Sequence, residues 1–208
     1  MQKLNQQPDI CPYFSPEFKV IPQYIIMKEG ECMELNNRTT SFFIFILSGE
    51  ITISFEQYTN RSVLENEMFF LPKNNCFKWK AVTQTVLILT GYNATIFPCT
   101  SVRARILYKI KAGVKFDCRG VVMKDEVKVV VNQMKHYLES GINCHHMYIL
   151  KHKELYLMFK HFYTYEEIIQ IFYLILGSNP LFNERVLDNY LKVKTVKELA
   201  GLLGYGIK

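Results

Sequence analysis

The stretch SFFIFILSGEITISFEQY, residues 41–58, decides the fold of the first half of the chain. It contains two segments rich in Ile, Phe and Tyr, SFFIFIL (41–47) and EITISFEQY (50–58), which meet at the turn sequence Ser48-Gly49. Short β-branched and aromatic segments that are bounded by Gly and Ser are typical of β-strands. The stretch therefore predicts two consecutive strands, and the continuous apolar run 42–47 predicts that the first of them is buried.

Similar segments recur on both sides, about every 8–12 residues, which is the spacing of an antiparallel sandwich or barrel. The further expected strands are 18–27, 67–72, 76–82, 85–92 and 104–110, and the sequences TNRS, PKNN and GYN between strands supply turn residues. Residues 1–17 contain three prolines and predict an irregular arm. We therefore expect an antiparallel β-barrel over residues 18–120.

After Gly120 the apolar residues recur at three- and four-residue steps, which indicates amphipathic helices. The first stripe consists of Val127, Val130, Val131, Met134, Tyr137 and Leu138. A second consists of Tyr148, Leu155, Met158, Phe159 and Phe162, and a third covers 165–176. The prediction for residues 121–177 is a helical region, so the fold class is α+β.

The composition limits the cellular setting more than the function. With 208 residues and 49% hydrophobic content the chain can bury a sizeable core, and its net charge of +6 suits an acidic partner without requiring one. None of the six cysteines forms a C-x-x-C pair, which argues against a zinc knuckle or a redox dithiol. The most apolar runs, 42–47 and 171–176, are too short to span a bilayer. We expect a reduced, cytoplasmic protein without a membrane partner.

The C-terminal segment carries a local motif. Thr195-Val-Lys-Glu198 has the spacing of a capping box, in which the threonine and the glutamate each accept from the other's backbone N–H at a helix start. The predicted buried face of this helix is Val196, Leu199, Ala200 and Leu203, and Gly204 follows where a turn needs a left-handed residue. We interpret residues 178–208 as an incomplete first helix-turn-helix that stops before its base-reading helix. A short capped helix without a role in DNA binding is the alternative.

The sequence VLDNYLKVKTVKELAGLLGYGIK, residues 186–208, resembles the start of the DNA-binding region of AraC-type bacterial transcription regulators. Residues 41–58 and 64–81 are similar to the cupin-type sensor domain of the same family. The resemblance implies an effector-sensing barrel, an arm that closes over the effector, and a helix near 125–139 that pairs two subunits. It places Thr195, Lys197 and Lys208 in the partial DNA-binding motif. We expect DNA to be a partner of the full-length protein, with no specific complex formed by the 208-residue chain alone.

The β half lacks the residues of a catalytic cupin. Many cupins hold a metal with histidines and a glutamate, but residues 1–135 contain no histidine, and Glu31, Cys32, Glu34 and Cys76 are a poor metal set. The five histidines, His136, His145, His146, His152 and His161, lie in the helical half, where surface or packing roles are expected. We therefore expect no catalytic residue, metal or cofactor. The alternatives are a cupin enzyme, a metal-independent small-molecule-binding cupin, and a regulator whose barrel acts by protein contact.

A sensor barrel would use aromatic walls and a few polar groups to bind an unknown small-molecule effector. The candidate effector-binding residues are Phe43, Phe45, Phe55, Trp79, Lys78 and Tyr92. Each aromatic side chain among them could instead be ordinary core. The candidate dimerisation residues of the expected homodimer are Val127, Val130, Val131, Met134 and Leu138. This stripe could equally pack on its own barrel.

Overall fold

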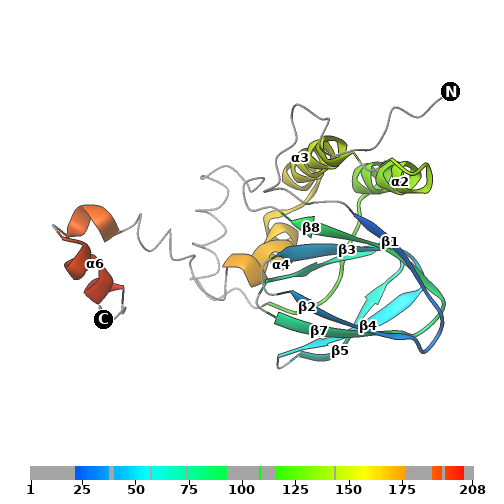
Figure 1. The fold of residues 1–208 in the computed structure, drawn as a ribbon, viewed down its shortest axis with the longest axis horizontal. Helices are drawn as coiled ribbons and strands as arrows, with labels where there is room; N and C mark the ends of the chain where they lie inside the picture. Colours follow the sequence, from blue (N-terminus) through cyan, green and yellow to red (C-terminus); the bar gives the residue numbers. More distant parts are fainter. Residues whose placement is uncertain are drawn as a thin grey trace.

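The computed structural model describes residues 22–37, 40–56, 58–73, 75–92, 108, 116–142, 144–176, 189–193 and 195–203. The strands are β1 (Gln23–Met27), β2 (Cys32–Asn37), β3 (Ser41–Ser48), β4 (Glu50–Phe55), β5 (Tyr58–Leu64), β6 (Glu67–Leu71), β7 (Asn75–Ala81), β8 (Thr85–Tyr92) and β9 (Val121–Val122). The helices are α2 (Asp125–Glu139), α3 (His145–Phe162), α4 (Tyr165–Leu176), the 3₁₀ turn η3 (Tyr190–Lys192) and α6 (Val196–Leu202). Figure 1 shows the strands gathered into two facing sheets, with α2 and α3 above them.

The strands form two antiparallel sheets whose order identifies the architecture. One sheet has the order β1-β8-β3-β6-β9 and the other β2-β7-β4-β5. The first of the eight strands along the chain, β1, pairs with the last, β8. In the same way β2 pairs with β7, β3 with β6 and β4 with β5. This pairing is the double Greek key of a jelly roll. Cupins share this architecture. The predicted cupin-like antiparallel barrel is therefore confirmed, as a sandwich of two sheets.

The decisive stretch 41–58 crosses from one sheet to the other. Strand β3 lies in the five-stranded sheet and β4 in the four-stranded sheet, with Gly49 between them. Gly49 has φ of +84°, and a Cβ built on it would lie 2.4 Å from the carbonyl oxygen of Gln84. Only glycine fits this crossing, both because of its backbone conformation and because of the neighbouring strand end.

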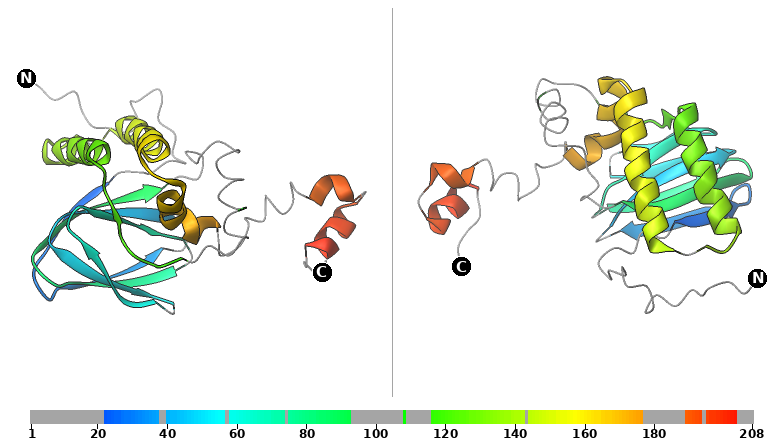
Figure 2. Two further views of the ribbon diagram at one scale, coloured as in Figure 1. Left: turned by 180° about the vertical axis from the view of Figure 1, so that it is seen from behind. Right: turned by 90° about the horizontal axis from the view of Figure 1, so that it is seen from above.

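The five-stranded sheet is buried on both faces. Ile44 and Ile46 of β3 point into the space between the sheets, whereas Phe43 and Phe45 belong to a second core under the helices. Figure 2 shows α2 and α3 side by side across the outer face of this sheet, while the four-stranded sheet carries no drawn helix. This double burial explains the unbroken apolar run 42–47.

The two edge strands of the four-stranded sheet were not predicted. β2 has the sequence CMELNN, and TNRS, which we expected to be a turn, lies inside β5. The chain instead turns at Glu56, which has φ of 49°. Both strands carry polar side chains toward solvent, so apolar content does not reveal them.

Three further expectations fall on the margins of the description. The arm 1–17 lies outside the described residues, and so does the strand 104–110 except for Tyr108, which is exposed and helical rather than extended. β9 adds residues 121–122 to the five-stranded sheet, so the barrel continues slightly past residue 120.

The helices predicted within 121–177 are present as α2, α3 and α4. In the part of the chain that is described, no helix is long and apolar enough to cross a bilayer.

Candidate functional site

The six candidate effector residues occupy three different environments. Phe55 and Trp79 point into the interior of the sandwich. Phe43, Phe45 and Tyr92 lie on the other face of the five-stranded sheet, under the helices. Lys78 follows the strand alternation to the solvent side of β7, where its Nζ lies 3.7 Å from a carboxylate oxygen of Glu34. The structure therefore does not bring the six residues together around one pocket.

The sandwich interior is filled with apolar side chains. Seven come from the five-stranded sheet, namely Met27, Ile44, Ile46, Phe69, Leu71, Leu87 and Leu89, and seven from the four-stranded sheet, namely Ile51, Ile53, Phe55, Val63, Phe77, Trp79 and Ala81. Trp79 is 2% exposed, and its indole Nε1 has no hydrogen-bond acceptor among the described residues. This N–H is a buried hydrogen-bond donor of the interior.

Cys118 enters the same interior from the segment that precedes β9. It is 1% exposed, and burial raises the pKa of its thiol to about 12. The thiolate is the form that binds metals and attacks electrophiles. Cys118 therefore remains a protonated core side chain at neutral pH.

The carboxylate and thiol residues that were considered as metal ligands lie on the outer surface. The Cys76 thiol donates to Glu34 Oε1 over 3.1 Å, and this hydrogen bond raises the pKa of Cys76. The same bond, followed by the charge of Lys78, lowers the pKa of Glu34. Glu31 is engaged locally, accepting from the Lys28 backbone N–H over 2.8 Å. Among the described residues no group of three His, Cys, Asp or Glu side chains could hold a metal.

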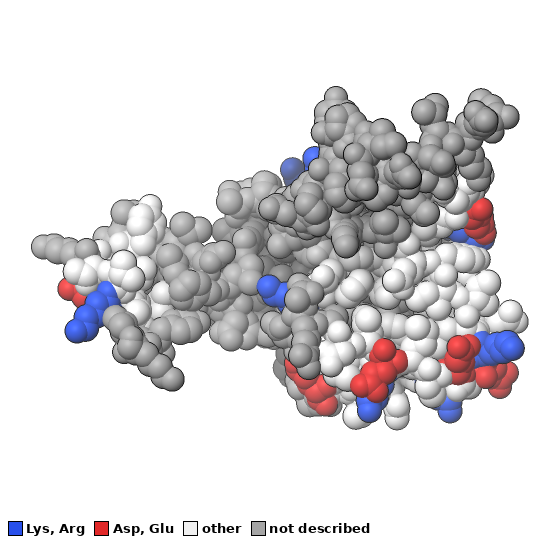
Figure 3. Space-filling view, in the orientation of Figure 1, with Lys and Arg blue, Asp and Glu red and all other residues white. Residues whose placement is uncertain are grey.

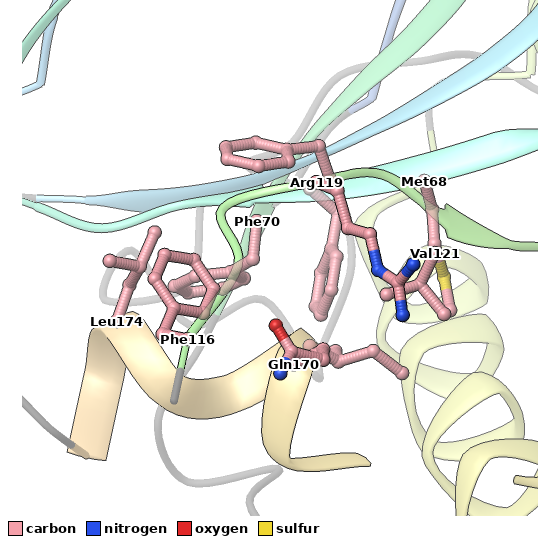
Figure 4. Close-up of a pocket in the computed structure, with 10 residues that line it drawn as sticks. Met68, Phe70, Phe116, Arg119, Val121, Gln170 and Leu174 are labelled. Atoms are coloured by element: carbon pink, nitrogen blue, oxygen red, sulfur yellow. The ribbon is translucent and has the colours of Figure 1, made fainter. Parts of the chain in front are cut away.

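A small cleft lies between β6, the segment 116–121 and α4 (Figure 4). Its lining consists of Phe43, Met68, Phe69, Phe70, Phe116, Arg119, Val121, Gln170, Ile171 and Leu174. Asp117 links its polar rim, because its carboxylate lies 3.3 Å from Arg119 Nε and its backbone N–H donates to Gln170 Oε1 over 3.2 Å. With its open mouth included the cleft measures about 240 Å³, and it has room for about one water molecule. In this form it does not accommodate a small-molecule effector.

The candidate dimerisation residues are part of the chain's own core. Val127, Val130, Val131 and Met134 of α2 are all buried against the five-stranded sheet, and Leu138 is half-buried beside them. Of the two possibilities left open by the sequence, the structure shows packing on the barrel. A second subunit could reach these four side chains only if α2 left the sheet.

A polar contact that the sequence did not reveal joins α3 to the sheet. His152 Nε2 lies 2.9 Å from the hydroxyl of Thr90 on β8, and the two side chains are 5% and 0% exposed. His145 lies two turns earlier on the same helix face and is 8% exposed. Burial is the main cause that lowers the pKa of both histidines, to about 4 in the case of His152. The available signal was their position in the apolar row of Tyr148, Leu155 and Phe159.

The C-terminal motif forms the predicted capping box. Thr195 Oγ1 accepts from the Glu198 backbone N–H over 3.1 Å, and Glu198 Oε2 accepts from the Thr195 N–H over 3.2 Å. Lys197 is exposed, and Lys208 lies outside the described residues. The predicted buried face is wrong at Val196, which is 83% exposed, whereas Leu203 is buried. Val196 and Leu203 are two turns apart and lie on the same side of α6, so the described residues cover that side only at its C-terminal end.

Comparison with known proteins shows a likeness in fold to solved structures, but it assigns the chain to no family. No protein-family model and no curated protein matches the chain. A conserved Streptococcus pyogenes protein of unknown function aligns at 19% identity over 35% of this chain and 62% of its own, with a TM-score of 0.32. The cupin domain of Schizosaccharomyces pombe Cnp3 aligns at 18% identity over 36% and 53%, with a TM-score of 0.33.

A cupin superfamily protein from Desulfitobacterium hafniense aligns at 17% identity over 36% of this chain and 68% of its own, with a TM-score of 0.32. The chain thus spans less than two thirds of the first two of these structures. At such TM-scores the assignment of a jelly roll rests on the strand order, and the alignments add no argument about function.

Proposed function

We propose that this chain is the sensing part of a DNA-binding transcription regulator of the AraC type. The observation that carries the proposal is the helix α6, which starts at the Thr195–Glu198 capping box and lies beyond a jelly roll and its covering helices. The sequence around this helix is the one that resembles the family. Jelly roll, helices and capped helix follow one another in the order that a sensor joined to a helix-turn-helix requires.

The filling of the barrel favours binding over catalysis. The described side chains that face the interior are apolar apart from the thiol of Cys118, which burial keeps protonated, so they offer neither a set of metal ligands nor a general acid or base. The unpaired Trp79 N–H is the group that we assign to effector recognition, since a buried donor without an acceptor costs about 1–3 kcal/mol that a ligand oxygen would recover. Ligand entry requires the interior side chains to repack, because they fill the space between the sheets.

We also propose a homodimer, since helix-turn-helix regulators read duplicated half-sites with paired subunits. The buried stripe of α2 is not its free surface in this structure. Sedimentation velocity of the chain between 1 and 100 µM gives the test. A monomer throughout this range would contradict the dimer and leave the DNA-binding proposal to its own experiment.

The DNA-binding proposal is tested on the gene and on its product. We expect the reading frame to continue beyond codon 208 with a basic recognition helix and a second helix-turn-helix. The product of that frame should select a specific site from random duplexes, at an affinity that falls steeply with salt. The 208-residue chain should select none. A stop codon directly after codon 208 would overturn the proposal in favour of a metal-independent, small-molecule-binding cupin.

A further inference from the structure

The contact between α3 and the five-stranded sheet contains two buried histidines. His145 and His152 are two turns apart, so at about 100° per residue both lie on the face that also carries Tyr148, Leu155 and Phe159. That face packs on the sheet next to Phe43 and Ile88. An imidazole is unusual in such a row, because its charged form cannot be solvated there.

The hydrogen bonds around His152 suit only its neutral form. With its proton on Nε2 the ring donates to the Thr90 hydroxyl, and Nδ1 keeps only a lone pair. Nδ1 is buried and has no hydrogen-bond partner among the described residues. A second proton on Nδ1 would therefore leave both a buried charge and a donor without an acceptor.

The charged groups of the surrounding elements do not offset such a charge. α3 itself contributes His145 and, at the rim, Lys151, whose Nζ lies 2.8 Å from Glu154. α2 contributes Tyr137 and Gln133, both of which contact the Lys151 ammonium. β8 contributes the neutral Thr90. His145 is the one charge among the described residues that acts on His152, and it is of the same sign.

We propose that α3 is an acid-released latch, in which a proton taken up by His152, with His145 acting in the same direction, detaches α3 from the five-stranded sheet. Release of α3 affects the helix that follows it, because α4 begins only two residues after α3 ends and packs on the same core. Release of α3 therefore loosens α4, which is the last described helix before η3 and α6. This property belongs to the sensor half and does not depend on DNA binding.

The pH range follows from the direction of the shift. The folded state lowers the pKa of His152 from 6.5 to about 4, so the docked helix is fully stabilised above about pH 6.5. That stabilisation is lost as the pH falls towards 4. The pKa of His152 is 6.5 in the open state and about 4 in the docked state. These two pKa values predict, by proton linkage, that the open fraction of α3 rises about 30-fold between pH 7.5 and pH 5.

Hydrogen exchange of the 208-residue chain tests the latch. Exchange is followed by mass spectrometry at pH 7.5 and 5.0 and converted to protection factors, which removes the intrinsic effect of pH on exchange. We expect α3 and α4 peptides to lose about 30-fold in protection while those of α2 and β3 keep theirs. Loss of protection by all elements together would mean global acid unfolding and would overturn the proposal, as would unchanged α3 protection at pH 5.0.

Two variants assign the effect to one side chain. His152→Gln retains an amide that can reach Thr90 and cannot titrate, so its α3 protection should change less than 3-fold between the two pH values. His161→Gln removes an exposed histidine of the same helix and should respond like the wild type. A full response in His152→Gln would sink the assignment. If that variant does not fold, the wild-type imidazole NMR titration decides, because His152 must gain its proton at the pH at which α3 opens.

Discussion

At the scale of single residues, Trp79 shows what strand alternation does and does not reveal. On β7 the structure buries Trp79 and exposes Lys78 and Lys80, as strand alternation requires, although Lys78 and Trp79 were both expected to bind the effector. The same alternation cannot say whether Phe43 faces the barrel interior or a covering helix, because both sides of β3 are apolar. This is why the candidate effector residues were divided between two cores.

The unpaired indole N–H of Trp79 leads to a first prediction. Trp79→Phe keeps an aromatic ring and removes the donor, so its free energy of unfolding should stay within about 1 kcal/mol of the wild type. Trp79→Ala leaves a cavity and should cost about 3–5 kcal/mol. Urea unfolding followed by circular dichroism measures both. A loss above 2 kcal/mol in Trp79→Phe would contradict this prediction.

His152 marks the limit of residue-level prediction. Its place in the apolar row of α3 could have been read from the sequence, but its partner Thr90 is 62 residues away and lies on another element. Thr90 and His152 come together only because of the register of β8 in the sheet and the position of α3 on that sheet. The sequence therefore predicts a packing histidine and does not predict a polar lock between helix and sheet.

At the scale of elements, the described residues contain two capping boxes. Besides Thr195–Glu198, Thr164 Oγ1 accepts from the Glu167 N–H over 3.2 Å, and Glu167 Oε2 accepts from the Thr164 N–H over 2.8 Å. Burial alone would raise the pKa of Glu167, but the Thr164 hydrogen bonds and the Lys124 ammonium, 3.0 Å away, lower it. The Thr-x-x-Glu spacing of Thr164–Glu167 is also present in the sequence, so this second box could have been predicted as the C-terminal one was.

The two boxes give a matched pair of variants. Thr164→Ala removes the cap of a helix that packs on the main core, so it should lower the free energy of unfolding by about 1 kcal/mol. Thr195→Ala should leave the thermal midpoint of the jelly roll unchanged and reduce only the hydrogen-exchange protection of α6. Differential scanning calorimetry and exchange of the α6 peptide separate the effects. Equal loss of midpoint in both variants would show that α6 is coupled to the barrel.

The packing of α2 yields another matched pair. Met134 is fully buried against the sheet and Val129 on the same helix is 56% exposed. Met134→Ala should destabilise the chain by about 2–5 kcal/mol, and Val129→Ala should change its stability by less than about 0.5 kcal/mol. If the α2 stripe instead paired two subunits, Met134→Ala would change the melting temperature mainly through its dependence on protein concentration. Thermal melts at 2 and 100 µM distinguish these cases.

At the scale of the whole molecule, the five-stranded sheet is shared by two cores. Sequence periodicity predicted the barrel and the helices separately, because a strand pattern and a helix pattern are each local. Their common core depends on which face of each strand the helices cover, and this follows from the jelly-roll order. The consequence is that α2, α3 and α4 share a core with the five-stranded sheet, whereas the four-stranded sheet keeps a polar outer face.

The distribution of surface charge agrees with the polar outer face of the four-stranded sheet. On the face shown in Figure 3, basic and acidic side chains of the described residues lie next to one another along the margin of the four-stranded sheet. Such a mixed surface does not create a single-sign field for nucleic acid. The proposed DNA binding is therefore assigned to the C-terminal segment, where the sequence resembles a DNA-binding region, and not to this face of the sandwich.

That dependence gives the last prediction. Lys197 is the exposed cation in the first turn of α6, and the first helix of a helix-turn-helix crosses the DNA backbone. In the full gene product, Lys197→Ala should therefore weaken specific and random duplexes alike, by roughly 3–10-fold, and reduce the slope of log affinity against log salt by about 0.9. Fluorescence anisotropy from 50 to 300 mM salt measures both quantities. Lys80→Ala, on the outer face of β7, is the control and should change neither. An unchanged slope in Lys197→Ala would remove α6 from the DNA interface, because losing a phosphate contact has to reduce the number of counterions released.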